Sequence, residues 1–333
     1  LQTSGGHPAG KRYPNFNKFL EAWPRDQPFC FWLGASDPHR GYKLNSGRES
    51  GMDLSKIELF DHYPDSETIR SDVADYYFEV QRFDSDVSKA LAKLESLDLL
   101  DSTLVVMTGD HGMPFPRCKS NLYDSGARVP MAVRWPDKIP PGRQVTDLVS
   151  TTDLAPTFLA AAGIPIPDSM TGKSWMNILA SKKSGRVEAS RNRVFTGKER
   201  HVPCQEGDDS GGTPMRAIRT DQFLLIHNYR PDRWPSGTPN YQLANLPGCW
   251  LGDCDNGPTK TYMVENQDQD AEHQLKYNLA FGKRPEWELY DLTKDPSQLV
   301  NIAGEFEYRD IKSDLIESLK SELISTADPR ETD

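Results

Sequence analysis

The sequence predicts an α/β fold with a mainly parallel central sheet, followed by a smaller subdomain built from an antiparallel sheet and a helix. Two apolar runs, at 29–35 and 103–108, are typical of strands buried inside a parallel sheet. Between them, apolar residues recur at three- and four-residue spacing over 72–97, as on one face of a long helix. Because this helix separates the two strands, we expect α/β layers with parallel strands at 29–35 and 103–108.

The first part of the chain, which we assign to residues 1–185, contains further elements around this framework. It starts with a polar stretch that holds one short amphipathic segment, and a second apolar strand follows the one at 103–108. The additional elements predicted here are the segment 16–23, loops over 43–71, a strand at 129–134 and a helix at 154–162.

The composition changes near residue 181, where a polar linker begins, and we assign residues 186–333 to the smaller subdomain. Short strand patterns separated by turn residues are typical of an antiparallel sheet. The stretch 230–285 is rich in Pro, Gly, Asn and Asp and is predicted to form long surface loops. The predicted elements are strands at 193–196, 215–220, 222–229 and 287–291 and a helix at 307–325.

Composition and charge exclude several classes of protein. The chain has 333 residues and a net charge of −10, whereas a nucleic-acid-binding surface is basic because it neutralises phosphates. No apolar run is long enough to span a membrane. The sequence starts at Leu1 without an initiator Met or a signal peptide, so we expect a cut or processed end. It has no Asn-x-Ser/Thr acceptor, which favours an exported bacterial protein, periplasmic or extracellular.

The chain has 5 cysteines. Because this number is odd, they cannot all pair with one another in disulfides. Cys249 and Cys254 lie close together in a Gly- and Pro-rich stretch. They are either bonded to each other, closing a small loop in an oxidising compartment, or both free.

The most informative motif follows the strand at 103–108. Asp110 and His111 lie between two glycines just past its carboxyl end, where open α/β sheets bind their ligands. A carboxylate and an imidazole are common metal ligands, so this pair predicts part of a divalent-metal site. The alternative is a strand-end turn in which Asp110 only caps backbone amides.

Residues with cationic side chains that could bind a substrate or an oxyanion lie in three other predicted loops. His39 and Arg40 follow the run at 29–35 and can donate hydrogen bonds to an oxyanion. Lys119 can place its charge on a sulfuryl or phosphoryl oxygen. Lys198 and His201 belong to a dense polar cluster, from Gly197 to Pro203, that can recognise a polar or anionic substrate group. For each of them a solvated surface turn is the alternative.

Three motifs together resemble type I sulfatases of the alkaline phosphatase superfamily. They are Phe31 to Arg40, Thr103 to Pro116 and Asn121 to Pro130. The short loop from Asp110 to Lys119 is most similar to the N-sulfoglucosamine sulfohydrolase (heparan N-sulfatase) branch. The resemblance covers most of residues 16–325.

This resemblance implies an alkaline-phosphatase-like sandwich, of which residues 1–185 form the C-terminal part, and hydrolysis of a sulfuric ester or sulfamate on a sulfated sugar. The implied metal is Ca²⁺, although the imidazole of His111 leaves Mn²⁺ or Zn²⁺ open. The implied roles are catalytic for His39 and Lys119, metal-binding for Asp110 and His111, and substrate-binding for Arg40, Lys198 and His201.

The sequence departs from the family at the nucleophile. Sulfatases use a formylglycine made within a Cys/Ser-x-Pro/Ala-x-Arg motif, and no cysteine or serine of this chain lies in that context. The Asp-Asp pair and the Gly-Lys-x-His motif of the family are absent as well. We therefore expect that this chain lacks the N-terminal half of the site and is inactive alone. A polypeptide that carries the missing N-terminal half is the expected partner.

Three functions are compatible with these expectations. The first is a sulfatase that is incomplete without its other half. The second is a phosphoester or phosphonate hydrolase of the same superfamily, since the Asp-His pair suits transition metals; metal content and substrate profiling separate these two. The third is a non-catalytic binder of sulfated glycans, which the absent nucleophile favours.

Overall fold

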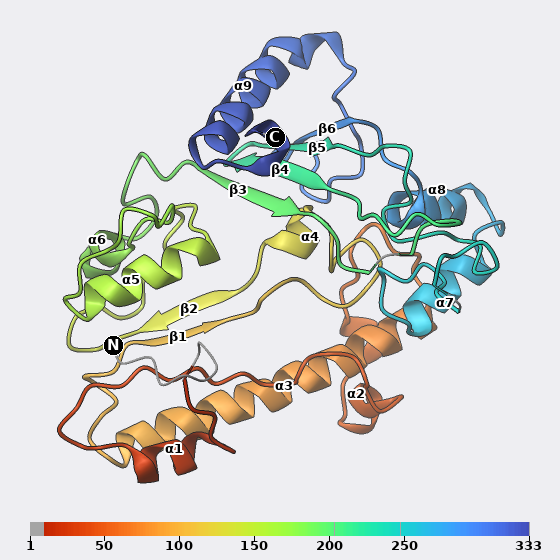
Figure 1. Cartoon of the computed structure of the whole chain (residues 1–333). Helices are drawn as coiled ribbons and strands as arrows, with labels where there is room; N and C mark the ends of the chain where they lie inside the picture. The colour runs from red at the N-terminus through yellow and green to blue at the C-terminus, as the bar shows by residue number, and fades with distance from the viewer. Residues whose placement is uncertain (1–9, 203, 247, 333) are drawn as a thin grey trace.

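The computed structural model describes residues 10–202, 204–246 and 248–332, so Pro203 of the predicted polar cluster lies outside the described residues. Figure 1 shows a four-stranded antiparallel sheet with a helix against it, and a long helix that runs below a two-stranded ribbon in this view. No helix of the described ranges is long and apolar enough to cross a membrane. The α/β class and the antiparallel C-terminal sheet with its helix are confirmed.

The long helix of the first part, α3 (Glu67–Glu95), begins before the apolar stripe that predicts it. Ser66 is its N-cap and accepts a hydrogen bond from the Ile69 N–H group. The other elements of this part are α1 (Phe16–Ala22), α2 (Ser46–Glu49), a 3-10 turn (Leu54–Lys56), β1 (Val105–Thr108), α4 (Asp124–Ala127), β2 (Met131–Arg134), a 3-10 turn (Thr151–Asp153), α5 (Leu154–Ala161) and α6 (Met176–Ala180).

The strand predicted at 29–35 is wrong. This segment is irregular and joins no sheet of the described residues, and Trp32 is 80% exposed. Its aromatic side chains pack on helix α1 instead, since the ring of Phe31 lies 4.5 Å from that of Phe19 and 5.1 Å from that of Phe16. An apolar run is the same signal whether it packs on a sheet or on a helix, which explains the error.

The parallel pairing expected for the strand at 103–108 is also wrong. β1 pairs with β2 in antiparallel register, with Val105 opposite Arg134 and Thr108 opposite Met131. Within the described part of the chain, this sheet has no third strand. Apolar composition predicts a buried strand but does not specify the direction of its neighbour.

The C-terminal sheet has the order β3-β4-β5-β6, and all its neighbours are antiparallel. The predicted hairpin and the strand at 287–291 are confirmed, whereas two helices, α7 and α8, occupy part of the stretch predicted as loops. The elements are β3 (Arg193–Lys198), β4 (Met215–Thr220), β5 (Phe223–Asn228), α7 (Pro258–Glu265), α8 (Ala271–Phe281), β6 (Trp287–Asp291), a 3-10 turn (Phe306–Tyr308), α9 (Arg309–Ser325) and α10 (Pro329–Thr332).

Side chains of this sheet alternate between two covered faces. On one face, Ile218 packs in a core with Leu319 of helix α9. On the other face, Ala217 packs with Leu122 and Tyr123, which come from the first part of the chain. The loop that follows β1 is thereby fixed against the C-terminal sheet.

Residues from both sides of the predicted division also share a core, which includes Phe115 and Met263. Arg117 is 1% exposed, and its guanidinium donates to the backbone carbonyl oxygens of Leu279 and Gln298. The two parts are therefore interlocked, and the division at residue 185 stays a prediction.

His62 is buried near this core, and its Nε2 atom has no hydrogen-bond partner. Its ring stacks on Phe60 with the ring centroids 5.2 Å apart. Burial lowers the pKa of His62 well below its usual value, and the charges of Arg117, Lys276 and Arg284 lower it further. The folded protein thus holds this imidazole in its neutral form.

We expect the protein to lose stability as the pH falls below about 6.5, the pKa of an unperturbed histidine. In that range the unfolded chain binds a proton at His62 that the folded chain does not bind. The free energy of unfolding therefore decreases with falling pH, by at most about 1.4 kcal/mol per pH unit for this group. His62→Phe, which keeps the stack on Phe60, should flatten this dependence in urea unfolding at a series of pH values. An equal slope in the variant and the parent protein would contradict the assignment.

Candidate functional site

Three of the predicted site residues meet at one loop of the second part, residues 249–256, which we call the acidic loop because it carries Asp253 and Asp255. Lys119 reaches it from the loop after β1. Lys198, at the end of β3, and His201, in the turn that follows, reach it from the other side. Residues far apart in the sequence are thereby brought together.

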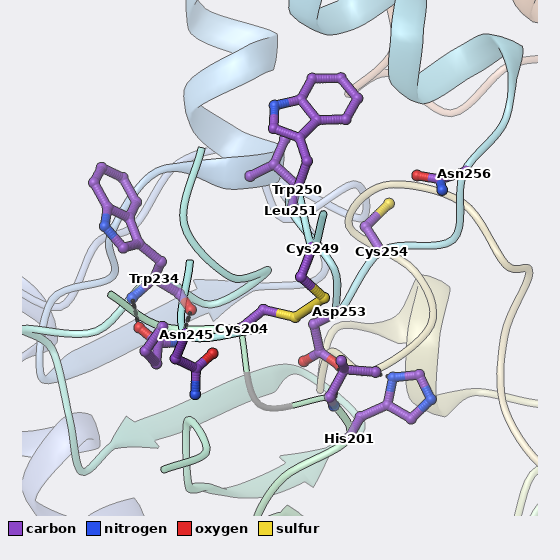
Figure 2. The surroundings of a disulfide bond; sticks show 12 residues. His201, Cys204, Trp234, Asn245, Cys249, Trp250, Leu251, Asp253, Cys254 and Asn256 are labelled. Carbon is purple, nitrogen blue, oxygen red and sulfur yellow. Dashed lines mark hydrogen bonds and ion pairs between the residues drawn. A yellow bond between two sulfur atoms is a disulfide. The ribbon is translucent and has the colours of Figure 1, made fainter. Parts of the chain in front are cut away.

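Asp253 is the more buried carboxylate of this loop, with 5% of its side chain exposed. It accepts hydrogen bonds from Lys198 Nζ, from His201 Nδ1 at 2.7 Å and from the Val202 N–H group at 3.0 Å; Figure 2 shows the imidazole next to the carboxylate. Burial by itself raises the pKa of Asp253, but the hydrogen bond from His201 and the charge of Lys198 outweigh it and lower the pKa below its usual range. Asp253 is therefore a carboxylate at neutral pH.

Lys119 pairs with the second carboxylate. Its Nζ atom lies 3.2 Å from Oδ2 and 3.3 Å from Oδ1 of Asp255. The Lys119 N–H group donates to the carbonyl oxygen of Met113 at 3.0 Å, so the loop folds back on itself. The side chain is 9% exposed, and Lys119 is thus not a solvated surface lysine. Its contact with a sulfate stays a prediction.

Arg40 links helix α3 to the loop after β1 at the edge of this site. Its guanidinium donates to both oxygens of Asp72, at 2.8 Å each, and its Nε donates to the carbonyl oxygen of Pro114 at 3.0 Å. Asp72 also accepts from the hydroxyl of Thr259 in helix α7. Most donors of Arg40 are occupied in this way, so the geometry favours a structural role over the predicted role as a substrate ligand.

His39 is exposed and lies in the turn beside Arg40, with its Nδ1 atom 3.0 Å from the Arg40 carbonyl oxygen. Because Arg40 contacts Pro114, this turn lies against the loop that carries Asp110 and Lys119. The arrangement is compatible with a shared site, and the role of His39 stays a prediction.

Asp110 and His111 do not form a complete metal site. The Asp110 side chain is 89% exposed, and its Oδ1 atom lies 3.8 Å from His111 Nε2. Among the residues that the structure describes, no group of three or more His, Cys, Asp or Glu side chains could hold a metal ion. Ca²⁺ takes about six to eight oxygen ligands, so two side chains do not fit a resident cation by themselves. Their role as metal ligands stays a prediction.

A disulfide fastens the acidic loop beside His201. It joins Cys249 to Cys204, and Cys254 is a buried free thiol that points away from the bond (Figure 2). Both alternatives for Cys249 and Cys254 are therefore wrong, because the partner, Cys204, lies 45 residues away and no spacing pattern signals it. A Cβ atom at Gly252 would overlap both bonded sulfurs, so this position requires glycine.

Lys260 organises the acidic loop, and the sequence patterns gave no indication of it. The residue is 1% exposed. Its Nζ donates to the carbonyl oxygens of Trp250, Leu251 and Cys254 and to the side chain of Asn256, at 2.7, 3.0, 2.9 and 2.8 Å. Burial lowers the pKa of Lys260. Such a complete set of acceptors offsets the cost of burying an ammonium group, so the loop is held in one conformation.

Asp253 and Asp255 are likewise absent from the sequence-based candidates. They lie in the stretch 230–285, whose Pro, Gly, Asn and Asp content is that of a surface loop. The one available signal is a pair of aspartates that flank Cys254 and follow Cys249, and this signal is weak without a partner for the cysteines.

Comparison with known proteins first defines the fold class. The structure of BT4656 in complex with its substrate D-glucosamine-2-N,6-O-disulfate superimposes with a TM-score of 0.56 at 21% identity, covering 86% of this chain and 47% of that one. The fold is therefore that of the alkaline-phosphatase-like sulfatases. The family model "Sulfatase" matches residues 5–164, and "N-sulphoglucosamine sulphohydrolase, C-terminal" matches residues 109–236. Together the two models cover residues 5–236, and over this stretch the chain resembles the sulfatase family and its N-sulphoglucosamine sulphohydrolase branch.

Two curated relatives agree with this assignment. An ulvan-active sulfatase of Formosa agariphila is 26% identical over 300 residues, which cover 89% of this chain and 46% of that protein. Human N-sulphoglucosamine sulphohydrolase is 27% identical over 339 residues, which cover 94% of this chain and 63% of that protein. The chain thus spans about half the length of the first of these and under two thirds of the second.

Titration of Ca²⁺ or Mn²⁺ into the chain should show weak binding or none, because Asp110 and His111 supply only two of the ligands that a hard cation needs. Isothermal calorimetry measures this, with Asp110→Asn as the matched variant. Tight, stoichiometric binding that disappears in Asp110→Asn would show that the chain holds a complete metal site.

Replacing both bonded cysteines, in Cys204→Ser/Cys249→Ser, should lower the free energy of unfolding. The bond closes a loop of 45 residues, for which chain entropy gives about 4 kcal/mol as an upper figure. Urea unfolding measures the change, and Cys30→Ser, which removes an exposed free thiol, is the control. Equal stability of the double variant and the control would contradict a stabilising disulfide.

Proposed function

We propose that this chain carries the sugar side of a sulfatase active site, and that the complete site hydrolyses a sulfuric ester or sulfamate on a sulfated carbohydrate. One observation supports this most strongly: Lys119, Lys198 and His201 meet at the acidic loop. The two lysine side chains are 9% and 8% exposed in a protein of net charge −10. Buried ammonium groups are costly, so their concentration at one loop favours a site for anionic oxygens.

In this proposal the candidate residues divide by position. His39, in the turn that Arg40 links to Pro114, and Lys119, in the loop after β1, contact the sulfate. Lys198 and His201, after strand β3, contact the sugar. The glucosamine disulfate bound as substrate by the structural relative supports a sulfated amino sugar. Asp110 and His111 contribute two ligands to a divalent cation, with Ca²⁺ favoured over Mn²⁺ or Zn²⁺ by family likeness.

A second segment completes the site in this proposal and supplies the formylglycine nucleophile and the remaining metal ligands. The β1–β2 ribbon has no further strand among the described residues, and all four residues of β1 are half-buried. Trp32, in the irregular segment 29–35, is 80% exposed. Apolar surface of this kind, in a chain that spans about half of its relatives, favours an additional α/β layer that packs on it.

The disulfide supports an exported location, either periplasmic or extracellular, because such bonds persist in oxidising compartments. Cys204 and Cys249 are joined across two loops of the site itself. A site that depends on this bond would be unreliable in a reducing cytosol.

We expect the purified chain to show no turnover of sulfate esters or sulfamates, because no residue of it lies in a formylglycine motif. Co-expression with a polypeptide that carries a Cys-x-Pro-Ser-Arg motif, encoded directly upstream, should restore activity. In that complex His39→Ala or Lys119→Ala should lower kcat about 100- to 1,000-fold, since each removes a group that stabilises developing charge. Release of sulfate from D-glucosamine-2-N,6-O-disulfate is the measurement.

Lys182→Ala, which changes an exposed lysine remote from the acidic loop in the sequence, is the control for that experiment. Turnover by the chain alone would refute the requirement for a second segment. Glycan binding without turnover in every combination would favour the non-catalytic binder, and preferential cleavage of phosphonate or phosphate esters would favour the phosphoester hydrolase.

A further inference from the structure

We propose that Asp253 is a positioning residue that presents the Nε2 atom of His201 to the substrate, an inference that rests on the proposed function of this site. An ionised carboxylate only accepts hydrogen bonds. Nδ1 of His201, at 2.7 Å from Asp253, therefore carries the hydrogen. In the neutral imidazole this leaves Nε2 with a free lone pair, directed away from Asp253.

The residues of this cluster differ in how much of their side chains is exposed. The side chains of Asp253 and Lys198 are 5% and 8% exposed, whereas that of His201 is 39% exposed. The two buried partners neutralise each other and stay in place, and His201 is the member of the cluster that reaches solvent. A ligand can therefore touch His201 without disturbing the ion pair beneath it.

The backbone around Asp253 is fixed before any ligand binds. The Asp253 N–H group donates to the carbonyl oxygen of Ser236 at 2.9 Å. The disulfide joins Cys204, just after His201, to Cys249, just before Asp253. Covalent and hydrogen-bonded links on both sides hold the imidazole against the carboxylate, which is the arrangement that a preorganised contact requires.

This geometry specifies the kind of substrate group that His201 recognises. A neutral imidazole with hydrogen on Nδ1 accepts at Nε2, so its natural partner is a sugar hydroxyl that donates. Lys198, held on the other oxygen of Asp253, keeps the carboxylate from competing for that hydroxyl. His201 thus acts as a specificity-determining acceptor for the sugar, and Asp253 acts through it.

Nitrogen NMR of the oxidised 333-residue chain shows which nitrogen of the His201 ring carries the hydrogen, and this test needs no ligand. The His201 signals are assigned by their absence in His201→Gln. At a pH where the ring is neutral, the parent chain should show the Nδ1–H tautomer. Asp253→Ala removes the oxygen that accepts from both His201 Nδ1 and the Val202 N–H group, so Nδ1 loses its acceptor and the tautomer should change to Nε2–H, the form that a free imidazole favours. A parent chain with the Nε2–H form, or an unchanged tautomer in Asp253→Ala, would overturn the proposal.

Binding of D-glucosamine-2-N,6-O-disulfate to the same variants tests the consequence. Asp253→Ala and His201→Gln should each weaken binding by up to about tenfold, the size expected for the loss of one hydrogen bond. The double variant should bind no more weakly than His201→Gln, because Asp253 acts only through His201. Asp232→Ala, at an exposed aspartate paired with Arg230, is the matched control and should bind like the parent chain.

The two measurements test different statements, so the role of Asp253 and the function of the site can be refuted separately. Additive losses in the double variant would show that Asp253 has a general structural role and would overturn the proposal. If neither the parent chain nor its complex with the second segment binds the sugar, the proposed function of the site is refuted, and the tautomer measurement alone decides whether Asp253 positions His201.

Discussion

The buried ammonium of Lys260 is the interaction on which the candidate site depends. It lies at the centre of the acidic loop and is bonded to four oxygen atoms of residues 250–256. Removing an ammonium from water costs several kcal/mol unless its hydrogen bonds are replaced. We infer that the loop has one conformation that satisfies Lys260, and in this conformation Asp253 binds Lys198 and His201 while Asp255 binds Lys119.

The two aspartates then determine where the cations lie. Without them Lys119 and Lys198 would be buried charges without counterions, and each would be driven to solvent or to its neutral form. With them, two ammonium groups and one imidazole from two separate segments are held at one loop. The same carboxylates weaken the attraction of the site for an anion, so the arrangement favours orientation of a polar, sulfated substrate over tight binding by charge alone.

The surroundings of the site are coupled to it through the core. Asp72 of helix α3 binds both Arg40 and Thr259, and so joins the turn with His39 to the start of α7, which follows the acidic loop. Arg117 joins the loop before Lys119 to the C-terminal part. The predicted division of the chain into two regions thus does not divide its site, because the site is built from both.

The sequence by itself determined the elements whose signal is local. Helix α3, the hairpin of β4 and β5 and helix α9 follow from apolar periodicity, and the family follows from short motifs around Asp110 and Lys119. Tertiary structure decided what depends on distant partners. The pair of Lys119 with Asp255 spans 136 residues, and the disulfide spans 45. No local pattern encodes such a pairing. The sequence around a loop aspartate or a single cysteine is the same whether or not a partner lies beside it in the folded protein.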